Sequence, residues 1–163
     1  MKRVFDLILA ASLFLLLLIP LLLATILVIT TSKGSALYYS DRIGKNNSIF
    51  KMPKFRSMLT GTPAVATHLL DNPGAYLSPI GGFLRSTSLD ELPQLFSVLK
   101  GDMSFVGPRP ALFNQSDLIA LRAEKGVDKL LPGITGWAQV NGRDDLSIPD
   151  KVALDAEYLN RQS

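Results

Sequence analysis

The feature that most constrains the fold is an uncharged, apolar segment close to the N-terminus. It covers residues 7–32 and reads LILAASLFLLLLIPLLLATILVITTS, 26 residues without a charge. As one helix it would be about 39 Å long, more than the hydrocarbon core of a bilayer, which is about 30 Å thick. Pro20 lies in its middle and cannot donate a hydrogen bond to the carbonyl of Leu16, so a break is predicted there. Each half alone would be too short to cross a bilayer.

Basic residues flank this segment on both sides. Lys2 and Arg3 precede it, and Lys33 and Arg42 follow it. Membrane proteins concentrate Lys and Arg on the cytoplasmic side, so both ends are expected there. A re-entrant helix-break-helix that enters and leaves one leaflet satisfies both the proline and the charges. A single kinked span is an open alternative, whereas a cleaved signal peptide is disfavoured by the length of the run and the lack of an A-x-A site.

The remaining residues, 33–163, have the composition of a globular domain with one core. Alternating apolar and polar residues at 49–55, preceded by Leu37 and Tyr39 and by an Asn-Asn turn, predict a hairpin of two short strands. Start and stop signals predict helices from Asp90 to Lys100, from Ser116 to Lys125 and from Pro149 onwards; Trp137 is predicted in a short strand. The fold class is therefore α+β and mainly helical, with a membrane anchor at 1–32 and a small cytosolic domain at 33–163.

Composition narrows the chemistry. The chain has no cysteine, which excludes a disulfide framework, a thiolate nucleophile and a cysteine-ligated metal site. Its formal net charge of +3 suits an anionic partner, such as phosphates, a nucleic acid or an acidic lipid surface.

Residues 88–110, SLDELPQLFSVLKGDMSFVGPRP, contain an acidic pair, Asp90 and Glu91. Ser88 and Glu91 have the spacing of a capping box, in which both side chains only cap a helix. A carboxylate at a helix N-terminus is also oriented and kept ionised, as a nucleophile or metal ligand must be. If the pair only caps, the chain is a membrane-anchored, non-catalytic interaction module whose basic face docks to lipid or a partner.

Basic residues in stiff Gly- and Pro-rich contexts accompany the acidic pair. Arginine forks bind phosphate oxygens, and carboxylates hold Mg²⁺, so the combination suits a site for a metal-bound diphosphate. The candidates for phosphate binding are Lys54, Arg56, Arg85, Arg109 and Arg143.

The motifs KRVFD, KFRSM, SLDELPQLFSVLKGDMSFVGPRP and PGITGWAQVNGRD, in this order and over nearly the whole chain, resemble the bacterial sugar transferases, the monotopic phosphoglycosyl transferases. The resemblance implies a two-step, Mg²⁺-dependent reaction. Asp90 attacks the sugar-bearing phosphorus of a UDP-sugar, UMP leaves, and undecaprenyl phosphate then takes the phosphosugar from the enzyme. Asp90 and Glu91 are the implied catalytic and metal-binding residues, and the five basic residues bind substrate.

The resemblance also implies a re-entrant anchor and a place on the cytoplasmic face of the bacterial inner membrane, in its inner leaflet. The reaction would be the first membrane step in the assembly of a glycan such as O-antigen or capsule, with no nucleic acid as partner. Relatives usually continue past AEYLNRQS with a further segment, so a C-terminally shortened catalytic domain is expected. The sugar, the pathway and the oligomeric state stay open.

Overall fold

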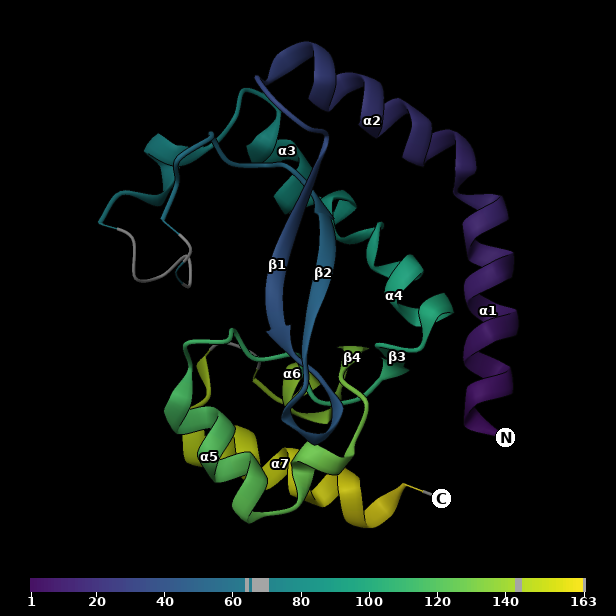
Figure 1. Ribbon diagram of the computed structural model, residues 1–163, viewed down its shortest axis with the longest axis vertical. Coiled ribbons are helices and arrows are strands. Elements are labelled where there is room, and N and C mark those ends of the chain that lie inside the picture. The colour runs from purple at the N-terminus through teal and green to yellow at the C-terminus, as the bar shows by residue number, and fades with distance from the viewer. Residues whose placement is uncertain (64, 66–70, 143–144, 163) are drawn as a thin grey trace.

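The computed structural model describes residues 1–63, 65, 71–142 and 145–162, and it mixes helices with short strands (Figure 1). Helices and 3₁₀ turns take up about half of the described chain, in agreement with the predicted mixed fold. The helices are α1 (Lys2–Leu16), α2 (Leu18–Thr31), α3 (Gly81–Ser86), α4 (Gln94–Lys100), α5 (Ser116–Glu124), α6 (Trp137–Val140) and α7 (Ile148–Arg161). The strands are β1 (Leu37–Ile43), β2 (Ile49–Phe55), β3 (Ser104–Val106) and β4 (Gly133–Thr135), and the 3₁₀ turns are η1 (Lys45–Asn47), η3 (Pro73–Tyr76), η4 (Leu89–Glu91) and η5 (Val127–Lys129).

The predicted hairpin is confirmed. Strands β1 and β2 pair antiparallel, from Leu37 opposite Phe55 to Ile43 opposite Ile49. Asn46 and Asn47 form the turn with φ angles of 54° and 58°, a left-handed conformation that asparagine tolerates better than most residues. The hairpin stands at the centre of the molecule, between the N-terminal helices and the α5–α7 layer (Figure 1).

A second, parallel pair of strands supports the loop that follows β3. Ser104 lies opposite Gly133, and Val106 lies opposite Thr135. The backbones approach so closely that a Cβ on Gly133 would lie 2.2 Å from the backbone nitrogen of Gly107. Only glycine fits there, and the close approach seats the loop at residues 107–110 directly on β4.

The break in the N-terminal segment lies at Leu17, which separates α1 from α2, and the two helices are bent by 62°. The prediction placed the break at Pro20, which is instead the third residue of α2. The proline ring clashes with the carbonyl four residues earlier, that of Leu16, so the first helix ends at Leu16. In the first turn of α2 the missing N–H of Pro20 costs no hydrogen bond.

Within the described residues, no individual helix has both the length and the apolar composition needed to cross a bilayer; only α1 and α2 together, as a bent pair, meet that test.

The N-terminal helices share buried clusters with the rest of the chain. Ala10 of α1 packs with Met52, Val98 and Met103, among others. In a second cluster, Leu21, Ala24 and Val28 of α2 pack with Phe55 and Leu84. The boundary predicted between residues 32 and 33 thus falls just after α2, but the segments on its two sides are packed together.

Helix α1 is tied to β3 by a buried carboxylate. Asp6 is 2% exposed, and it accepts hydrogen bonds from the Ser104 hydroxyl at 2.8 Å and from the Phe105 amide at 3.3 Å. Lys2 also donates to the Ser104 hydroxyl, and it donates to the carbonyl of Val106 at 2.8 Å. The start of α1 is therefore held against β3 by charge-assisted hydrogen bonds.

Arg3 ties the same helix to the end of α4. Its guanidinium donates to the carbonyls of Val98 at 2.6 Å and Leu99 at 3.0 Å. A cation at a helix C-terminus satisfies free carbonyls and complements the helix dipole. Lys2 and Arg3, which the sequence analysis treated as flanking charges, thus bind backbone carbonyls of the globular part.

Asp6→Asn should destabilise the protein by about 2 kcal/mol, because it removes the charge from a buried acceptor of two hydrogen bonds. The measurement is the thermal unfolding midpoint in detergent, followed by the fluorescence of Trp137. Asp41→Asn is the control, since the Asp41 side chain is 47% exposed and lies 3.8 Å from Lys51. Equal losses in the two variants would contradict the assigned role of Asp6.

Candidate active site

A cavity of about 790 Å³ lies between the β1–β2 hairpin, the η4 turn and the α5–α7 layer. Every predicted site residue that the structure describes lines it: Lys54, Arg56, Arg85, Asp90, Glu91 and Arg109. Arg143 lies outside the described residues. The cavity thus brings together residues from β2, α3, η4 and the loop after β3, which are distant in sequence.

The acidic pair lies in a single 3₁₀ turn and not in an α-helix. The η4 turn contains Asp90 and Glu91, and α4 begins only at Gln94, so the helix predicted from Asp90 starts four residues later. The backbone of Ser88 has a left-handed conformation, with a φ of 57°, and its side chain makes no capping hydrogen bond. The capping-box interpretation is therefore wrong.

The Glu91 carboxylate binds two cations instead of the backbone. Its Oε1 accepts from Lys54 Nζ at 2.7 Å and from Arg109 Nη2 at 3.3 Å. Burial alone would raise the pKa of Glu91, but the charges and hydrogen bonds of Lys54 and Arg109 outweigh it and lower the pKa to about 2. Glu91 is thus a fixed anion that orients two cations on the cavity wall.

Asp90 has the opposite electrostatic environment. Asp90 is 8% exposed. Burial, and after it the charge of Glu91, raises the pKa of Asp90, whereas the charges of Lys54 and Arg85 oppose that rise. Burial thus opposes ionisation of this carboxyl, whereas the nearby cations favour it. Asp90 nevertheless lines the cavity beside two cations rather than packing into the apolar core.

Lys54 is held between these groups. Burial lowers its pKa, and the neighbouring charge of Glu91 opposes that shift. Arg56 extends in another direction, and its guanidinium donates to the carbonyl of Lys33 at 3.0 Å, just after α2. Arg56 therefore lines the cavity while also fixing the segment that follows the N-terminal helices.

Three further basic residues, which the sequence motifs did not indicate, also line the cavity: Arg42, Arg122 and Lys151. Arg42 donates to the carbonyl of Pro110 at 3.1 Å, and its pKa falls to about 10, first because of burial and then because of Arg109. A signal for Arg42 existed in β1, where alternate residues share one face of a strand. Tyr38, which pairs with Lys54, shares that face with Arg42.

The donor set allows a limited metal site. Among the residues that the structure describes, no three His, Cys, Asp or Glu side chains form a group that could hold a metal ion. Mg²⁺ commonly takes one or two carboxylates and completes its shell with substrate phosphates and water. The adjacent carboxylates of Asp90 and Glu91 fit only a site of this kind, in which the substrate supplies further oxygens.

Trp137 lies in α6 and not in the predicted strand. Its indole N–H donates to Glu157 of α7 at 3.0 Å, and the guanidinium of Arg161 lies 5.9 Å from its ring centroid. These contacts hold α6 against α7, so tertiary packing determines the conformation there.

Comparison with known proteins identifies one family and several similar sequences. The sequence model of the family described as "Bacterial sugar transferase" matches residues 1–163. The chain is 38% identical over 178 residues to "Exopolysaccharide production protein ExoY" of Rhizobium meliloti, covering 99% of this chain and 78% of that protein. It is 36% identical over 177 residues to "Undecaprenyl-phosphate galactose phosphotransferase" of Salmonella typhimurium, covering 98% of this chain and 36% of that protein.

A third relative, "Undecaprenyl-phosphate glucose phosphotransferase" of Komagataeibacter xylinus, is 42% identical over 176 residues, which cover 99% of this chain and 32% of that protein. An "Uncharacterized sugar transferase" of Haemophilus influenzae is 37% identical over 181 residues, which cover 37% of its length. The chain thus spans about a third of the longer relatives.

The low pKa of Glu91 predicts a loss of stability in acid. Its ordinary pKa of 4.5 falls to about 2 in the folded protein, so its contribution is fully present above about pH 4.5 and disappears as the pH falls towards 2. Over this window the free energy of unfolding should fall by on the order of 3 kcal/mol. The measurement is chemical denaturation at a series of pH values.

Glu91→Gln should flatten that part of the pH profile. Glu157→Gln is the control, because it removes an ion pair whose Arg161 side chain is 68% exposed. An acid limb that persists unchanged in Glu91→Gln would show that Glu91 does not carry it.

Proposed function

The chain belongs to the bacterial sugar transferase family, and from this membership and the geometry of the cavity we propose that it is a phosphoglycosyl transferase. The reaction moves a sugar-1-phosphate from a UDP-sugar to undecaprenyl phosphate and releases UMP. The observation that carries the proposal is the placement of Asp90 and Glu91 on the wall of one cavity with Lys54, Arg85 and Arg109.

In the first step, an oxygen of the ionised Asp90 carboxylate bonds to the sugar-bearing phosphorus of the UDP-sugar. The bond from that phosphorus to the bridging oxygen breaks, and UMP leaves with the electron pair. In the second step, a phosphate oxygen of undecaprenyl phosphate attacks the same phosphorus and Asp90 departs as a carboxylate. The covalent intermediate lets a soluble donor and a lipid acceptor use one cavity in turn.

The cations of the cavity offset the repulsion between an anionic nucleophile and an anionic diphosphate. The charges of Lys54 and Arg85 both favour the ionised form of Asp90, which is the form that attacks. Glu91 orients Lys54 and Arg109 through its two hydrogen bonds, so its proposed role is to position cations rather than to transfer a proton.

Asp90 and Glu91 are also the proposed residues for Mg²⁺, in a site that substrate phosphate oxygens would complete. A bound Mg²⁺ would supply charge neutralisation at the diphosphate. The uridine donor is part of the same proposal and follows from the family alone.

The proposed location is the cytoplasmic face of the bacterial inner membrane, with α1 and α2 as a re-entrant anchor in the inner leaflet. Large apolar side chains on both helices are exposed to an extent that is unusual on a water-facing surface. They include Phe5 at 61%, Ile8 at 64%, Leu15 at 73%, Ile19 at 69% and Leu22 at 55%. A lipid environment would cover this surface.

Asp90→Asn should lower UMP release from a UDP-sugar by roughly 10³-fold or more, because a neutral amide is a poor nucleophile. Without lipid acceptor, the unaltered protein should release about one UMP per active site and retain labelled phosphosugar. The variant should do neither. The retained phosphosugar is measured with a panel of UDP-sugars labelled in the β-phosphate, and the released UMP, which carries the α-phosphate, is measured with the same donors labelled in the uridine.

Asp102→Asn is the matched control. Asp102 follows α4, forms an ion pair with Lys100 at 2.9 Å and is not among the residues that line the cavity. Full turnover in Asp90→Asn would exclude Asp90 as the nucleophile, and an unaltered protein inactive with every UDP-sugar would contradict the proposed function.

Labelling of single cysteines tests the anchor, since the chain itself has none. One cysteine is added before Met1 and another replaces Ser35, on the two sides of the bent pair. A membrane-impermeant maleimide should label both from the cytoplasmic side of sealed vesicles. Labelling from opposite sides would show that the pair spans the bilayer.

A further inference from the structure

We propose that Arg122 and Asp155 are positioning residues for Arg109: the buried pair holds the backbone of the loop at residues 107–110 so that the Arg109 guanidinium reaches Glu91. The inference rests on the proposed function, because it assigns the pair a part in the same reaction. Neither residue belongs to the motifs that the sequence analysis selected.

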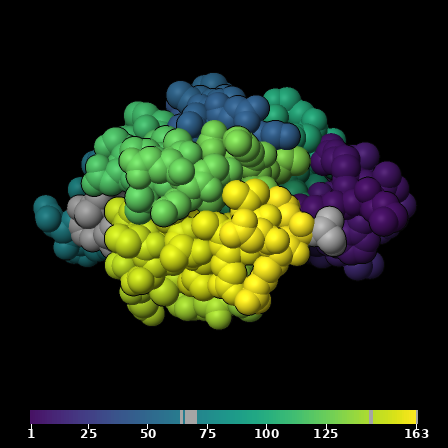
Figure 2. All heavy atoms as spheres, turned by 90° about the horizontal axis from the view of Figure 1, so that it is seen from below, coloured from purple at the N-terminus to yellow at the C-terminus, as the bar shows by residue number. Residues whose placement is uncertain are grey.

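The pair joins α5 to α7, two helices that lie side by side in Figure 2, where they are green and yellow. Arg122 is 8% exposed and Asp155 is 1% exposed. Oδ2 of Asp155 accepts from Arg122 Nε at 3.0 Å and from Nη2 at 2.7 Å. Two hydrogen bonds from one planar guanidinium fix both the place and the orientation of its remaining nitrogen.

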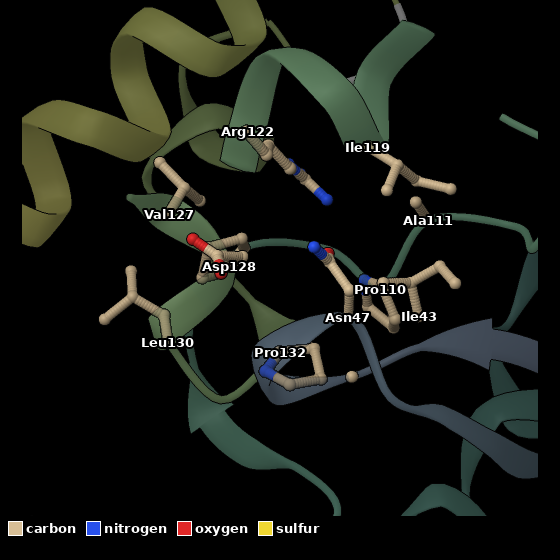
Figure 3. Close-up of a pocket in the computed structure, with 12 residues that line it drawn as sticks. Ile43, Asn47, Pro110, Ala111, Ile119, Arg122, Val127, Asp128, Leu130 and Pro132 are labelled. Atoms are coloured by element: carbon tan, nitrogen blue, oxygen red, sulfur yellow. The ribbon is translucent and has the colours of Figure 1, made fainter. Parts of the chain in front are cut away.

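That remaining nitrogen binds the active-site loop. Arg122 Nη1 donates to the carbonyl oxygen of Arg109 at 2.8 Å. Figure 3 shows Arg122 extending from its helix towards the segment that carries Pro110 and Ala111. The contacts therefore run from Asp155 through Arg122 to the backbone of Arg109, and from the Arg109 side chain to Glu91.

The backbone of each residue in this loop takes part in a hydrogen bond. The Gly107 amide donates to Thr135, and the Pro108 carbonyl accepts from the Gly133 amide, both at 2.9 Å. The Pro110 carbonyl accepts from Arg42 at 3.1 Å. Arg122 supplies the bond to Arg109, the residue in the loop whose side chain carries charge into the site.

Packing against β4 and hydrogen bonds together hold this loop. A second cavity of about 30 Å³, roughly the room that one water molecule takes, lies against it (Figure 3). Pro108, Pro110 and Arg122 line this space, and Pro110 and Arg122 line the large cavity as well. Because part of the loop borders free space, its hydrogen bonds contribute to its position together with the packing on β4.

Protein stability alone does not explain why these two buried residues form an ion pair. Replacing a buried ion pair by apolar residues of similar volume is often neutral or stabilising. An apolar pair cannot reproduce the hydrogen bond that Arg122 Nη1 donates to the carbonyl of Arg109. The double substitution Arg122→Met with Asp155→Leu therefore separates positioning from folding.

The experiment compares UMP release in four proteins: the unaltered chain, the Met/Leu double variant, Arg109→Ala, and all three substitutions together. The double variant should lose about tenfold to a hundredfold in kcat/KM for the UDP-sugar, as misplaced groups do. In the Arg109→Ala background the same two substitutions should change kcat/KM by less than about twofold, because their effect passes through Arg109. The thermal midpoint should stay close to that of the unaltered protein.

Arg122→Lys is a second variant in case the apolar pair does not fold, since it keeps a charge for Asp155 without the planar fork. Arg161→Lys is the matched control, because Arg161 also pairs with an acid but lies on the exposed side of α7. It should leave kcat/KM unchanged. Equal losses with and without Arg109, or no loss with Arg109 present, would overturn the proposal.

Hydrogen exchange tests the same idea without substrate. The Gly107 amide, which donates to the Thr135 carbonyl, should exchange faster in the double variant and in Arg122→Lys, because the loop is then held less firmly. Unchanged exchange in both would overturn the positioning role. Absence of UMP release from the unaltered protein, together with faster exchange in the variants, would instead refute the proposed function alone.

Discussion

The hydrogen bonds that Lys54 and Arg109 donate to one oxygen of Glu91 are the contacts on which the site depends. They join β2, the η4 turn and the loop after β3, three segments that are far apart in the sequence. All three side chains are partly buried, so water screens their attraction less than it would at the surface. The cluster therefore determines the distance between the acidic pair and the cations that face it.

The two neighbouring carboxyl groups differ in environment although they differ little in chemistry. Glu91 gains two direct cationic partners, and its pKa falls to about 2. For Asp90, burial and the negative charge of Glu91 outweigh the charges of Lys54 and Arg85, and its pKa rises. Neighbouring acids whose pKa values are driven apart are a recurring sign of divided roles. Here Glu91 holds two cations, and Asp90 is the proposed nucleophile.

Local patterns predicted the local structure well. The hairpin was predicted from alternation and its Asn-Asn turn, and the motif around Asp90 drew attention to the site. Errors arose where distant contacts decide: Glu91 binds Lys54 and Arg109 instead of capping, and Trp137 is helical because α6 packs against α7. Arg122 was missed for the same reason, since its significance comes from partners 33 and 13 residues away.

The docking of α1 onto β3 has a consequence for the reaction. Asp6 bonds to Ser104 and Phe105, and only Val106 separates these residues from the loop that carries Arg109. A tilt or a vertical shift of α1 must therefore move the start of that loop. In the proposed membrane setting, a change in the thickness or curvature of the surrounding leaflet would be transmitted through α1 and β3 to this loop. It would change the position of the loop relative to the lipid acceptor.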